Sequence, residues 1–426
     1  MAIEMNAEFT MHSQNGGSAE LRDFYERMPY PAPLTSLDEH RDLYRNPERR
    51  RALFHLIFPS ERPRTNLDIL VAGCGTSQAA RYALREPDAR VTGIDISGTS
   101  LAHTRTLQEK YKLDNLTLHQ LSLLDVQQLG QSFDLIVCTG VLHHLADPDV
   151  GLQALRRVLK RDGAMQIMVY ARYGRTGLYM IREYCQLLGI TATQPELLAL
   201  GATLRSLPEN HPLAHLLDKV QDFAHPYSLA DAFLHPQDCA FTVPEIFDWL
   251  DRCGMSFGRW MEQAPYLPQC GALAGTPHAE QLRELPEPAQ HVAAELFRGT
   301  ITQHNFVAYR RDRPFDRQPI RFTGEQWRNY IPISLPWTKC IRDGVPPGAI
   351  AVLLNQAHKH PDLTLKVNAA QYRLFTQIDG HRTLGEIVQN SETDEKRILE
   401  FFQRLWQYDQ IVFDASGACG GTNMAS

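Results

Sequence analysis

The stretch that decides the fold covers residues 66–97 and reads NLDILVAGCGTSQAARYALREPDARVTGIDIS. An apolar run over 67–72 ends at a glycine turn over 73–75, a segment compatible with a helix follows, and a second apolar run ends in an acid, Asp95. This order predicts strand, tight turn, helix and strand, which together form one βαβ unit. A ligand is expected at the edge where the two strands end.

The residue types of this unit suit a ligand that contains a nucleoside. Gly73 and Gly75 carry no side chain, so the backbone can turn sharply and a ligand can lie against bare N–H and C=O groups. Asp95 follows about twenty residues later, where a carboxylate accepts hydrogen bonds from the two hydroxyls of a ribose. A short glycine turn also occurs in ordinary strand-to-helix connections, so the elements that follow must decide.

The next segments continue the same alternation. Residues 133–140, FDLIVCTG, predict another buried strand, and VLHHL (141–145) follows where that strand should end. The leucine and valine spacing over 147–160 predicts a helix, and 164–170 predicts a strand after a turn at 161–163. Alternating strands and helices indicate an α/β fold with a parallel sheet.

The whole segment resembles the class I S-adenosylmethionine-dependent methyltransferases. Four ordered motifs carry the resemblance: VAGCGTS (71–77), GIDIS (93–97), SFDLIVCTGVLHHL (132–145) and LKRDGAMQIMVY (159–170). It implies a Rossmann-like core with a seven-stranded, mostly parallel sheet, and S-adenosylmethionine as cofactor. The cofactor-binding residues that it implies are Tyr25, Tyr30, Gly73, Cys74, Gly75, Gln78, Asp95, Ile96, Ser122, Leu123, Leu124, Thr139, Gly140 and His144.

Three positions depart from the pattern of many relatives. Val71 stands in place of an acid two residues before the first glycine, and Ser77 in place of a third glycine. Ser122 stands where many relatives carry the acid that accepts from the adenine amino group. Asp125 is close by, and backbone groups of 122–124 are also able to read adenine. A dinucleotide would suit a longer glycine pattern, which this chain lacks.

Composition bounds the remaining possibilities. With 426 residues and 43% hydrophobic content, the chain has room for two or three domains. A formal charge of −6 argues against extended contact with nucleic acid. Eight cysteines without a C-x-x-C pair predict reduced thiols and no structural metal. No leader-like N-terminus or membrane-length apolar run is present, so a cytoplasmic protein without a membrane partner is expected.

Breaks in the pattern predict five regions: an N-terminal arm and lid (1–65), the methyltransferase domain (66–312), a linker (313–347), a small mainly helical module (348–415) and a flexible tail (416–426). The aromatic and proline-rich stretch 24–33 favours an extended lid, and the resemblance implies that Tyr25 and Tyr30 fold over the cofactor. Asn46 is expected to cap a helix over 47–58. A helical insertion at about 191–240 separates the fifth strand from the last two, where it can cover the active site.

The C-terminal module shows helical patterns over 348–358, 368–377, 384–388 and 395–408, and a short strand over 410–413. Thr383 and Glu386 form the sequence signature of a capping box. The stretch FTQIDGHRTLGEIV (375–388) resembles winged-helix modules that grip a peptide in peptide-modifying systems. A packing or dimerisation module fits equally well, whereas few Arg or Lys lie on one face to hold DNA.

Methyl transfer requires alignment and a nucleophile with a free lone pair. The catalytic candidates near the strand ends are His143, Tyr170 and Tyr173, which could line a pocket for an amine or accept its proton. Asp231 and His235 form a polar cluster within the insertion, although surface polarity is the favoured interpretation. VLHH occupies the place of the Asn/Asp-Pro-Pro-aromatic loop, which disfavours methylation of exocyclic base amines.

Three functions stay open. The lid, insertion and C-terminal module favour a protein methyltransferase acting on lysine, and the layout is similar to bacterial protein-lysine methyltransferases. The VLHHL motif is equally typical of small-molecule and natural-product methyltransferases. Val71 and Ser77 alone suggest a non-catalytic cofactor-binding scaffold. A homodimer through 21–58 and 281–300 is a further hypothesis, because apolar spacing does not separate an interface from a core.

Overall fold

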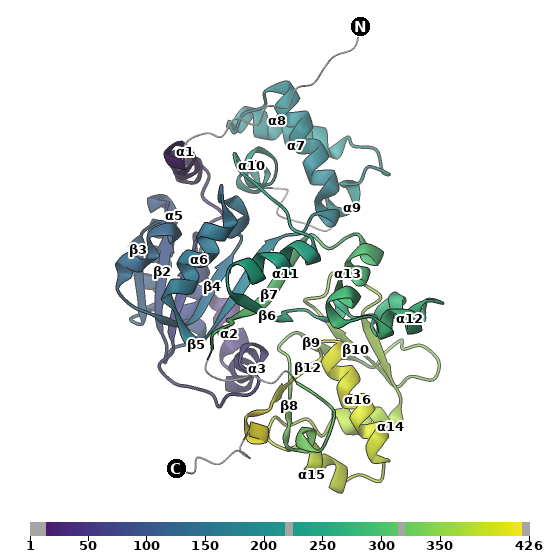
Figure 1. The fold of residues 1–426 in the computed structure, drawn as a ribbon. Helices are drawn as coiled ribbons and strands as arrows, with labels where there is room; N and C mark the ends of the chain where they lie inside the picture. Colours follow the sequence, from purple (N-terminus) through teal and green to yellow (C-terminus); the bar gives the residue numbers. More distant parts are fainter. Residues whose placement is uncertain (1–13, 218–224, 314–319, 420–426) are drawn as a thin grey trace.

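A seven-stranded sheet forms the centre of the computed structural model, which describes residues 14–217, 225–313 and 320–419 (Figure 1). The strand order is β3-β2-β1-β4-β5-β7-β6, and only β7 runs antiparallel to its neighbours. This confirms the predicted α/β class with its mostly parallel sheet. The strands are β1 (Asp68–Ala72), β2 (Arg90–Asp95), β3 (Leu116–Gln120), β4 (Phe133–Thr139), β5 (Leu159–Tyr170), β6 (Met255–Trp260) and β7 (Gln303–Arg310).

Helices cover both faces of the sheet, so its central strands are apolar on both sides. In β1, Leu70 and Ala72 join one buried cluster while Ile69 and Val71 join the other. The buried role of Val71 accounts for an apolar residue at that position. The covering helices are α4 (Gln78–Arg85), α5 (Gly98–Tyr111), α6 (Pro148–Val158) and α11 (Val243–Arg252).

Strand β5 is assigned from Leu159, but its regular pairing with β4 and β7 begins at Ala164, where the sequence predicted the strand. Between Leu159 and Ala164 the register with β4 shifts, so residues 160–163 bulge out of the ladder where a turn was expected. Pro286 separates two helices in the segment that follows β6, α12 (Ala279–Glu284) and α13 (Glu287–Arg298). A proline ends a helix because the residue before it avoids helical dihedrals. The short helices η5 (Ala264–Tyr266) and η6 (Gly271–Gly275) precede them.

The N-terminal arm is partly helical, in contrast to the extended lid predicted over 24–33. Helix α1 (Gln14–Arg27) runs through the start of this stretch and ends just before Pro29, and only the remainder is extended or bent. Two further helices, α2 (Asp38–Tyr44) and α3 (Pro47–Ile57), lead into the sheet. The Asn46 side chain accepts from the Glu48 N–H at 2.9 Å, which confirms the predicted cap.

The insertion begins before the predicted residue 191. It contains η3 (Tyr173–Arg175), α7 (Thr176–Leu188), α8 (Gln194–Arg205), α9 (Ala214–Leu217) and α10 (Pro226–Leu234), and its residues 218–224 lie outside the described residues. Helix α10 packs on α7 and α8, and Phe24 of α1 joins their buried cluster with Leu178, Leu200 and Phe233. We call α1, α7, α8 and α10 the cap; it lies beyond the sheet, where α1 packs on α5 (Figure 1).

The predicted linker 313–347 is folded in its described part. It contains η7 (Gln326–Asn329), β8 (Ile331–Ser334) and β9 (Thr338–Ile341). Strand β8 pairs with β12 (Ile411–Asp414), and β9, β10 (Ala351–Asn355) and β11 (Thr364–Val367) form a second small sheet. The helix expected over 348–358 is therefore wrong, because AVLLN forms a strand with alternating burial.

The remaining predictions for the C-terminal module agree with the structure. Helices α14 (Ala369–Phe375), α15 (Leu384–Gln389) and α16 (Glu395–Gln407) follow the expected segments, and Thr383 and Glu386 form the capping box. Residues Ser416–Cys419 of the predicted tail form η8, and the rest of the tail lies outside the described residues. The winged-helix resemblance and the domain limits stay predictions.

The C-terminal module packs against helix α3 through an ion pair and apolar contacts. The carboxylate of Asp414 lies 2.8 Å from Arg51 Nη2 and 3.3 Å from His55 Nε2. Around this contact, Leu53 and Leu56 pack against Ile333 and Val412. Burial alone would raise the pKa of the Asp414 carboxyl, but contacts with His55, Ser416 and Arg51 hold it below its ordinary value.

Replacing Asp414 by Asn is expected to lower the free energy of unfolding at neutral pH by about 3 kcal/mol, because Arg51 loses a buried partner. Since the folded state depresses the pKa of Asp414, this contribution is present above pH about 4 and disappears as the pH falls further. Urea unfolding should therefore separate the two proteins at pH 7 and less so in acid. An equal gap at both pH values would contradict the role of the charge.

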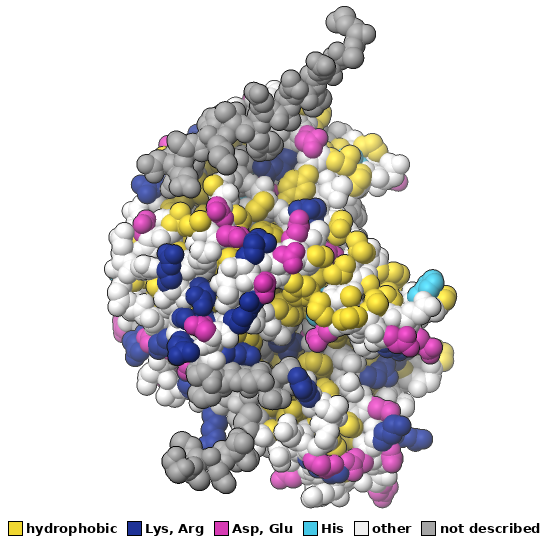
Figure 2. Space-filling model, viewed as in Figure 1, with side chains coloured by type: hydrophobic (Ala, Val, Ile, Leu, Met, Phe, Trp, Pro, Cys, Tyr) yellow, Lys and Arg dark blue, Asp and Glu magenta, His cyan; other side chains and the backbone are white. Residues whose placement is uncertain are grey.

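The surface shows mixed charges and scattered apolar groups (Figure 2). Apolar side chains gather over the region of α11 and α13, where Leu296 and Phe297 are exposed. This patch falls within the segment 281–300 considered for a dimer, which stays a prediction. Among the described residues, no helix combines the length and the apolar character needed to cross a membrane, and seven cysteines are free.

Candidate active site

The predicted cofactor residues lie where the parallel strands end. Gly73 follows β1, Asp95 closes β2, and Thr139 and Gly140 follow one another at the end of β4. Because parallel strands present their carboxyl ends at one edge, the sheet brings these distant segments together. Tyr170, the last residue of β5, lies at the same edge.

The glycine turn is tight and crowded. Gly73 and Gly75 adopt φ of +67° and +54°, a region that side chains disfavour. The N–H groups of Gly73 and Cys74 both donate to the Ile94 carbonyl, at 2.8 and 2.9 Å. A side chain at Gly73 would meet Val141, the first residue of the VLHHL motif, at 2.3 Å. Both positions therefore require glycine.

Asp95 fixes this turn with its carboxylate. Its Oδ2 accepts from the Gly75 N–H at 2.8 Å, and its Oδ1 accepts from the Ser97 N–H at 2.9 Å. Burial raises the pKa of Asp95, and the two backbone N–H donors oppose that rise. Each carboxylate oxygen can accept more than one hydrogen bond, so both remain able to accept from a ribose.

A second group of predicted residues lies beside Asp95. The Leu121 N–H donates to the Asp95 carbonyl at 2.9 Å, which places 122–124 next to the end of β2. Ser122 caps the short helix η1 (Leu123–Leu129), with Leu123 buried and Leu124 exposed. The Ile96 carbonyl accepts from the Gln120 side chain at 3.1 Å. Residues 122–124 carry no acid, but Asp125 follows them in the first turn of η1, and the binding of adenine by this segment stays a prediction.

Gln78 and His144 complete the predicted set. Gln78 opens helix α4, and its amide donates to the Thr139 hydroxyl at 2.6 Å, which connects the glycine loop to β4. His144 lies on η2 (Leu142–His144) just beyond Gly140. The structure thus gathers the motifs of β1, β2 and β4 around one edge.

The N-terminal arm covers the glycine turn. The Thr76 hydroxyl donates to the Pro31 carbonyl at 2.8 Å, and a side chain at Gly75 would meet the Tyr30 carbonyl at 2.8 Å. On α1, Glu26 accepts from the N–H groups of Gly98 and Thr99 at 2.6 and 3.0 Å. Sequence reasoning missed Glu26, which caps the N-terminus of α5 and holds the arm against β2.

Gly75→Ala is expected to weaken binding of S-adenosylhomocysteine by about 10-fold, since the new methyl group displaces the arm and strains the turn by roughly 1–2 kcal/mol. Gly130→Ala is a matched control, because Gly130 has φ of +64° and open space around it. Calorimetry on both variants separates crowding from backbone strain. Equal losses in the two variants would contradict the covering role of Tyr30 and Pro31.

Asp231 of α10 lies between two tyrosines from other parts of the chain. Its Oδ1 accepts from the Tyr25 hydroxyl at 3.2 Å, and its Oδ2 accepts from the Tyr170 hydroxyl at 3.3 Å. Burial raises the pKa of Asp231 to about 6. Tyr25 also accepts from the Ser97 hydroxyl through its carbonyl, at 3.2 Å. Tyr25 thus connects Ser97, next to Asp95 at the end of β2, to the buried carboxylate of Asp231.

Two of the three catalytic candidates lie in contact in the structure, and the third lies apart from them. His143 is fully buried, and its ring lies 3.8 Å from the ring of Tyr170. Burial lowers the pKa of His143 well below its ordinary value, so the ring is neutral. Tyr173, in contrast, is 41% exposed, and no ring contact joins it to His143 or Tyr170 in the described part of the chain. His143 and Tyr170 are brought together, and Tyr173 is not.

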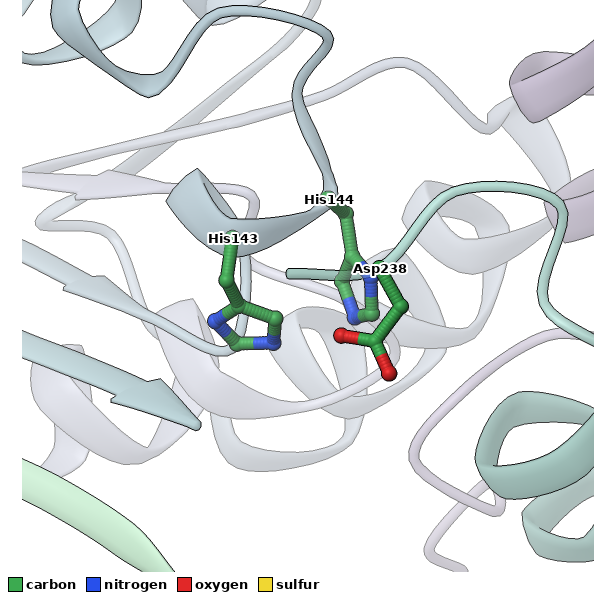
Figure 3. A group of neighbouring side chains, drawn as sticks. All are labelled: His143, His144 and Asp238. Atoms are coloured by element: carbon green, nitrogen blue, oxygen red, sulfur yellow. The ribbon is translucent and has the colours of Figure 1, made fainter. Parts of the chain in front are cut away.

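His143, His144 and Asp238 point toward one another (Figure 3). Asp238 lies in the loop after α10 and accepts from Arg182 at 2.9 Å. The cationic carbon of Arg175 lies 3.4 Å from the Tyr170 ring centre, where it favours a cation–π contact. Sequence reasoning missed Asp238 and Arg175, since nothing local signals the burial that the cap imposes on them.

Comparison with known proteins identifies the class. Residues 70–165 match the family model described as a methyltransferase domain. The structure of PKMT2 from Rickettsia typhi superposes with a TM-score of 0.62 at 17% identity, covering 90% of this chain and 77% of that one. The chain therefore carries a methyltransferase domain over residues 70–165, and its fold is that of a class I methyltransferase.

Two curated proteins show local similarity. An uncharacterised protein of Synechococcus is 32% identical over 59% of this chain and 61% of its own length. The trans-aconitate 2-methyltransferase of Deinococcus radiodurans is 35% identical over 26% of this chain and 41% of its own length. The chain thus spans less than two thirds of either relative.

Proposed function

We propose that this protein transfers the methyl group of S-adenosylmethionine to a protein or peptide, with a lysine nitrogen as the acceptor. The observation that carries the proposal is the buried carboxylate of Asp231, held between the hydroxyls of Tyr25 and Tyr170. Aromatic rings and a carboxylate together suit a cationic amine. Tyr25 connects this group to Ser97 and the edge at Asp95.

We assign the cofactor to the residues gathered at the strand ends. The glycine turn supplies bare backbone, Asp95 supplies ribose acceptors, and 122–124 supply backbone groups for adenine. These residue types fit the group, and a side chain at Gly73 or Gly75 would meet Val141 or the Tyr30 carbonyl. When bound, the cofactor supplies an electrophilic methyl group on a sulfonium.

The chain's own residues would then hold and orient the amine. The Asp231 carboxylate attracts the ammonium form and accepts a hydrogen bond from its N–H, while Tyr25 and Tyr170 enclose it. Asp231, whose pKa burial raises to about 6, would take the proton that the ammonium must lose, so that the neutral nitrogen could accept the methyl group that the cofactor would supply. The cap excludes water from this step through its shared core with Phe24.

The architecture supports a macromolecular acceptor. The cap and the C-terminal module add surface beyond what a metabolite needs, and the arrangement extends over 90% of this chain when it is superposed on PKMT2, a protein lysine methyltransferase. The alternative is a small-molecule acceptor, which the local similarity to a trans-aconitate methyltransferase favours. A non-catalytic scaffold is the third hypothesis.

The test is methyl transfer from radiolabelled S-adenosylmethionine into a lysate of the native host, with protein separated from small molecules before counting. Asp231→Asn serves as the acceptor-site variant and Asp95→Ala as the cofactor-site variant. Label on a protein lysine, located by mass spectrometry and lost in both variants, supports the proposal. Label only in the small-molecule fraction would support the small-molecule acceptor instead. If no methyl group is transferred to any acceptor, the non-catalytic scaffold is the hypothesis that remains.

A further inference from the structure

Three side chains of metal-ligand type converge at the junction of the sheet and the cap. His143 and His144 lie on η2 after β4, and Asp238 follows α10 (Figure 3). One ligand atom from each of the three lies within 4.8 Å of the others. Both histidines are buried to within 3% of full burial, and the Asp238 side chain is 1% exposed.

The hydrogen bonds around these residues leave lone pairs facing one another. His144 Nδ1 lies 2.9 Å from the Gln237 carbonyl, which only accepts, so Nδ1 carries the proton and Nε2 carries the lone pair. Asp238 Oδ2 accepts from Arg182, whereas its buried Oδ1 makes no hydrogen bond of normal geometry in the described chain, and the Tyr179 hydroxyl is a neighbouring donor of this carboxylate. Neither ring nitrogen of buried His143 has a described partner. Such an arrangement is costly unless a cation or donor completes it.

We propose that His143, His144 and Asp238 bind one divalent transition-metal ion of the zinc type. Two imidazoles and one carboxylate, with a further position open, match the three-ligand sites that zinc and related ions occupy. The Gln237 carbonyl behind His144 and the Arg182 guanidinium behind Asp238 have the supporting positions that hold metal ligands in place. This proposal is independent of the acceptor assigned above.

The charges around the three ligands indicate which kind of metal ion the site can bind. Arg182 pairs with Asp238, and Arg175 Nη2 lies 3.9 Å from the same carboxylate. With Asp231 close by, the two guanidinium charges balance the two carboxylates. The binding free energy of a cation therefore receives little from the net charge of the site and must come from direct bonds to imidazole nitrogen. Zn²⁺ and Co²⁺ form such bonds well, whereas Ca²⁺ and Mg²⁺ prefer oxygen.

His235 is an internal control for this site. Its ring lies 3.8 Å from that of His144, but its Nδ1 accepts from the Gln237 N–H at 3.1 Å. The proton of His235 is thus on Nε2, and the ring offers no free lone pair. A second grouping, His144 with Asp231 and His235, is less suited because the only lone pair of the His235 ring already accepts from the Gln237 N–H.

The experiment uses the untagged full-length chain after removal of metal by a chelator. We expect it to bind one equivalent of Co²⁺, with the visible absorption of low-coordinate cobalt, to exchange that ion for Zn²⁺, and to gain thermal stability. His144→Ala and Asp238→Asn should weaken Zn²⁺ binding by at least about 100-fold, whereas His235→Gln should retain it. Circular dichroism checks that each variant folds.

Several results would overturn the proposal. The first is that the native chain binds no saturable equivalent of Co²⁺ or Zn²⁺. The second is that Asp238→Asn binds Zn²⁺ with unchanged affinity. The third is that His235→Gln and His144→Ala lose equal Zn²⁺ affinity, which would indicate the second grouping. If His144→Ala fails to fold, Asp238→Asn decides, because the amide has nearly the shape of the carboxylate.

Discussion

Asp95→Ala is expected to weaken the binding of S-adenosylhomocysteine by about 100-fold or more. The substitution removes a carboxylate that accepts from Gly75 and Ser97 and that we assign to the ribose hydroxyls. Hydrogen bonds to a charged group contribute roughly 1.5–3 kcal/mol each, so losing two costs at least about 3 kcal/mol. Isothermal titration calorimetry measures the change directly.

Two further variants make this result specific. Asp95→Asn keeps the shape of the side chain but replaces one acceptor oxygen by a donor, so binding should fall by an intermediate amount. Asp114→Asn changes an exposed acid on the turn before β3 and should leave the affinity unchanged. Native affinity in Asp95→Ala would count heavily against our placement of the cofactor site.

Asp231→Asn is expected to lower kcat/KM for the methyl acceptor by about 100-fold while the affinity for S-adenosylhomocysteine changes little. The amide carries no charge to attract an ammonium, and its NH₂ group replaces one acceptor between Tyr25 and Tyr170. Steady-state kinetics with the labelled acceptor measures the first quantity and calorimetry the second.

The pair Tyr25→Phe and Tyr170→Phe tests whether the carboxylate itself matters. Each variant removes one hydrogen bond to Asp231 and keeps the ring, so a smaller loss than in Asp231→Asn is expected. A loss of cofactor affinity in Asp231→Asn equal to its loss of kcat/KM would show that the residue supports the fold of the cap rather than the acceptor.

The sheet could be predicted because its signals are local. Apolar runs such as 67–72 and 133–139 are buried on both faces, and Gly73 and Gly75 leave little choice of turn. The strand over Ala351–Asn355 was mistaken for a helix because a short apolar run fits either structure, and only pairing with β9 and β11 decides between them. Strand β8, within the segment expected to be a linker, was missed for a related reason, since it forms by pairing with its distant partner β12.

The candidate site was predictable on its cofactor side and much less on its acceptor side. Asp95 and the glycine turn lie within one βαβ unit, so sequence spacing places them. Asp231 looks like surface polarity in LADAFLHPQD, because its burial comes from Tyr25, more than 200 residues earlier in the chain. Glu26 and Asp238 were missed because their partners, the N-terminus of α5 and Arg182, are likewise distant in sequence.

The common core of α1 with α7, α8 and α10 also limits how this protein can be recombined. Phe24 is buried among side chains of the insertion, so the insertion is not an exchangeable cassette. In a chimaera that receives only residues 176–240 from a relative, the incoming helices would lack the arm against which their apolar side chains pack. Phe24 would in turn lose the side chains that bury it. New acceptor specificity should be transplantable only when the arm and the insertion travel together.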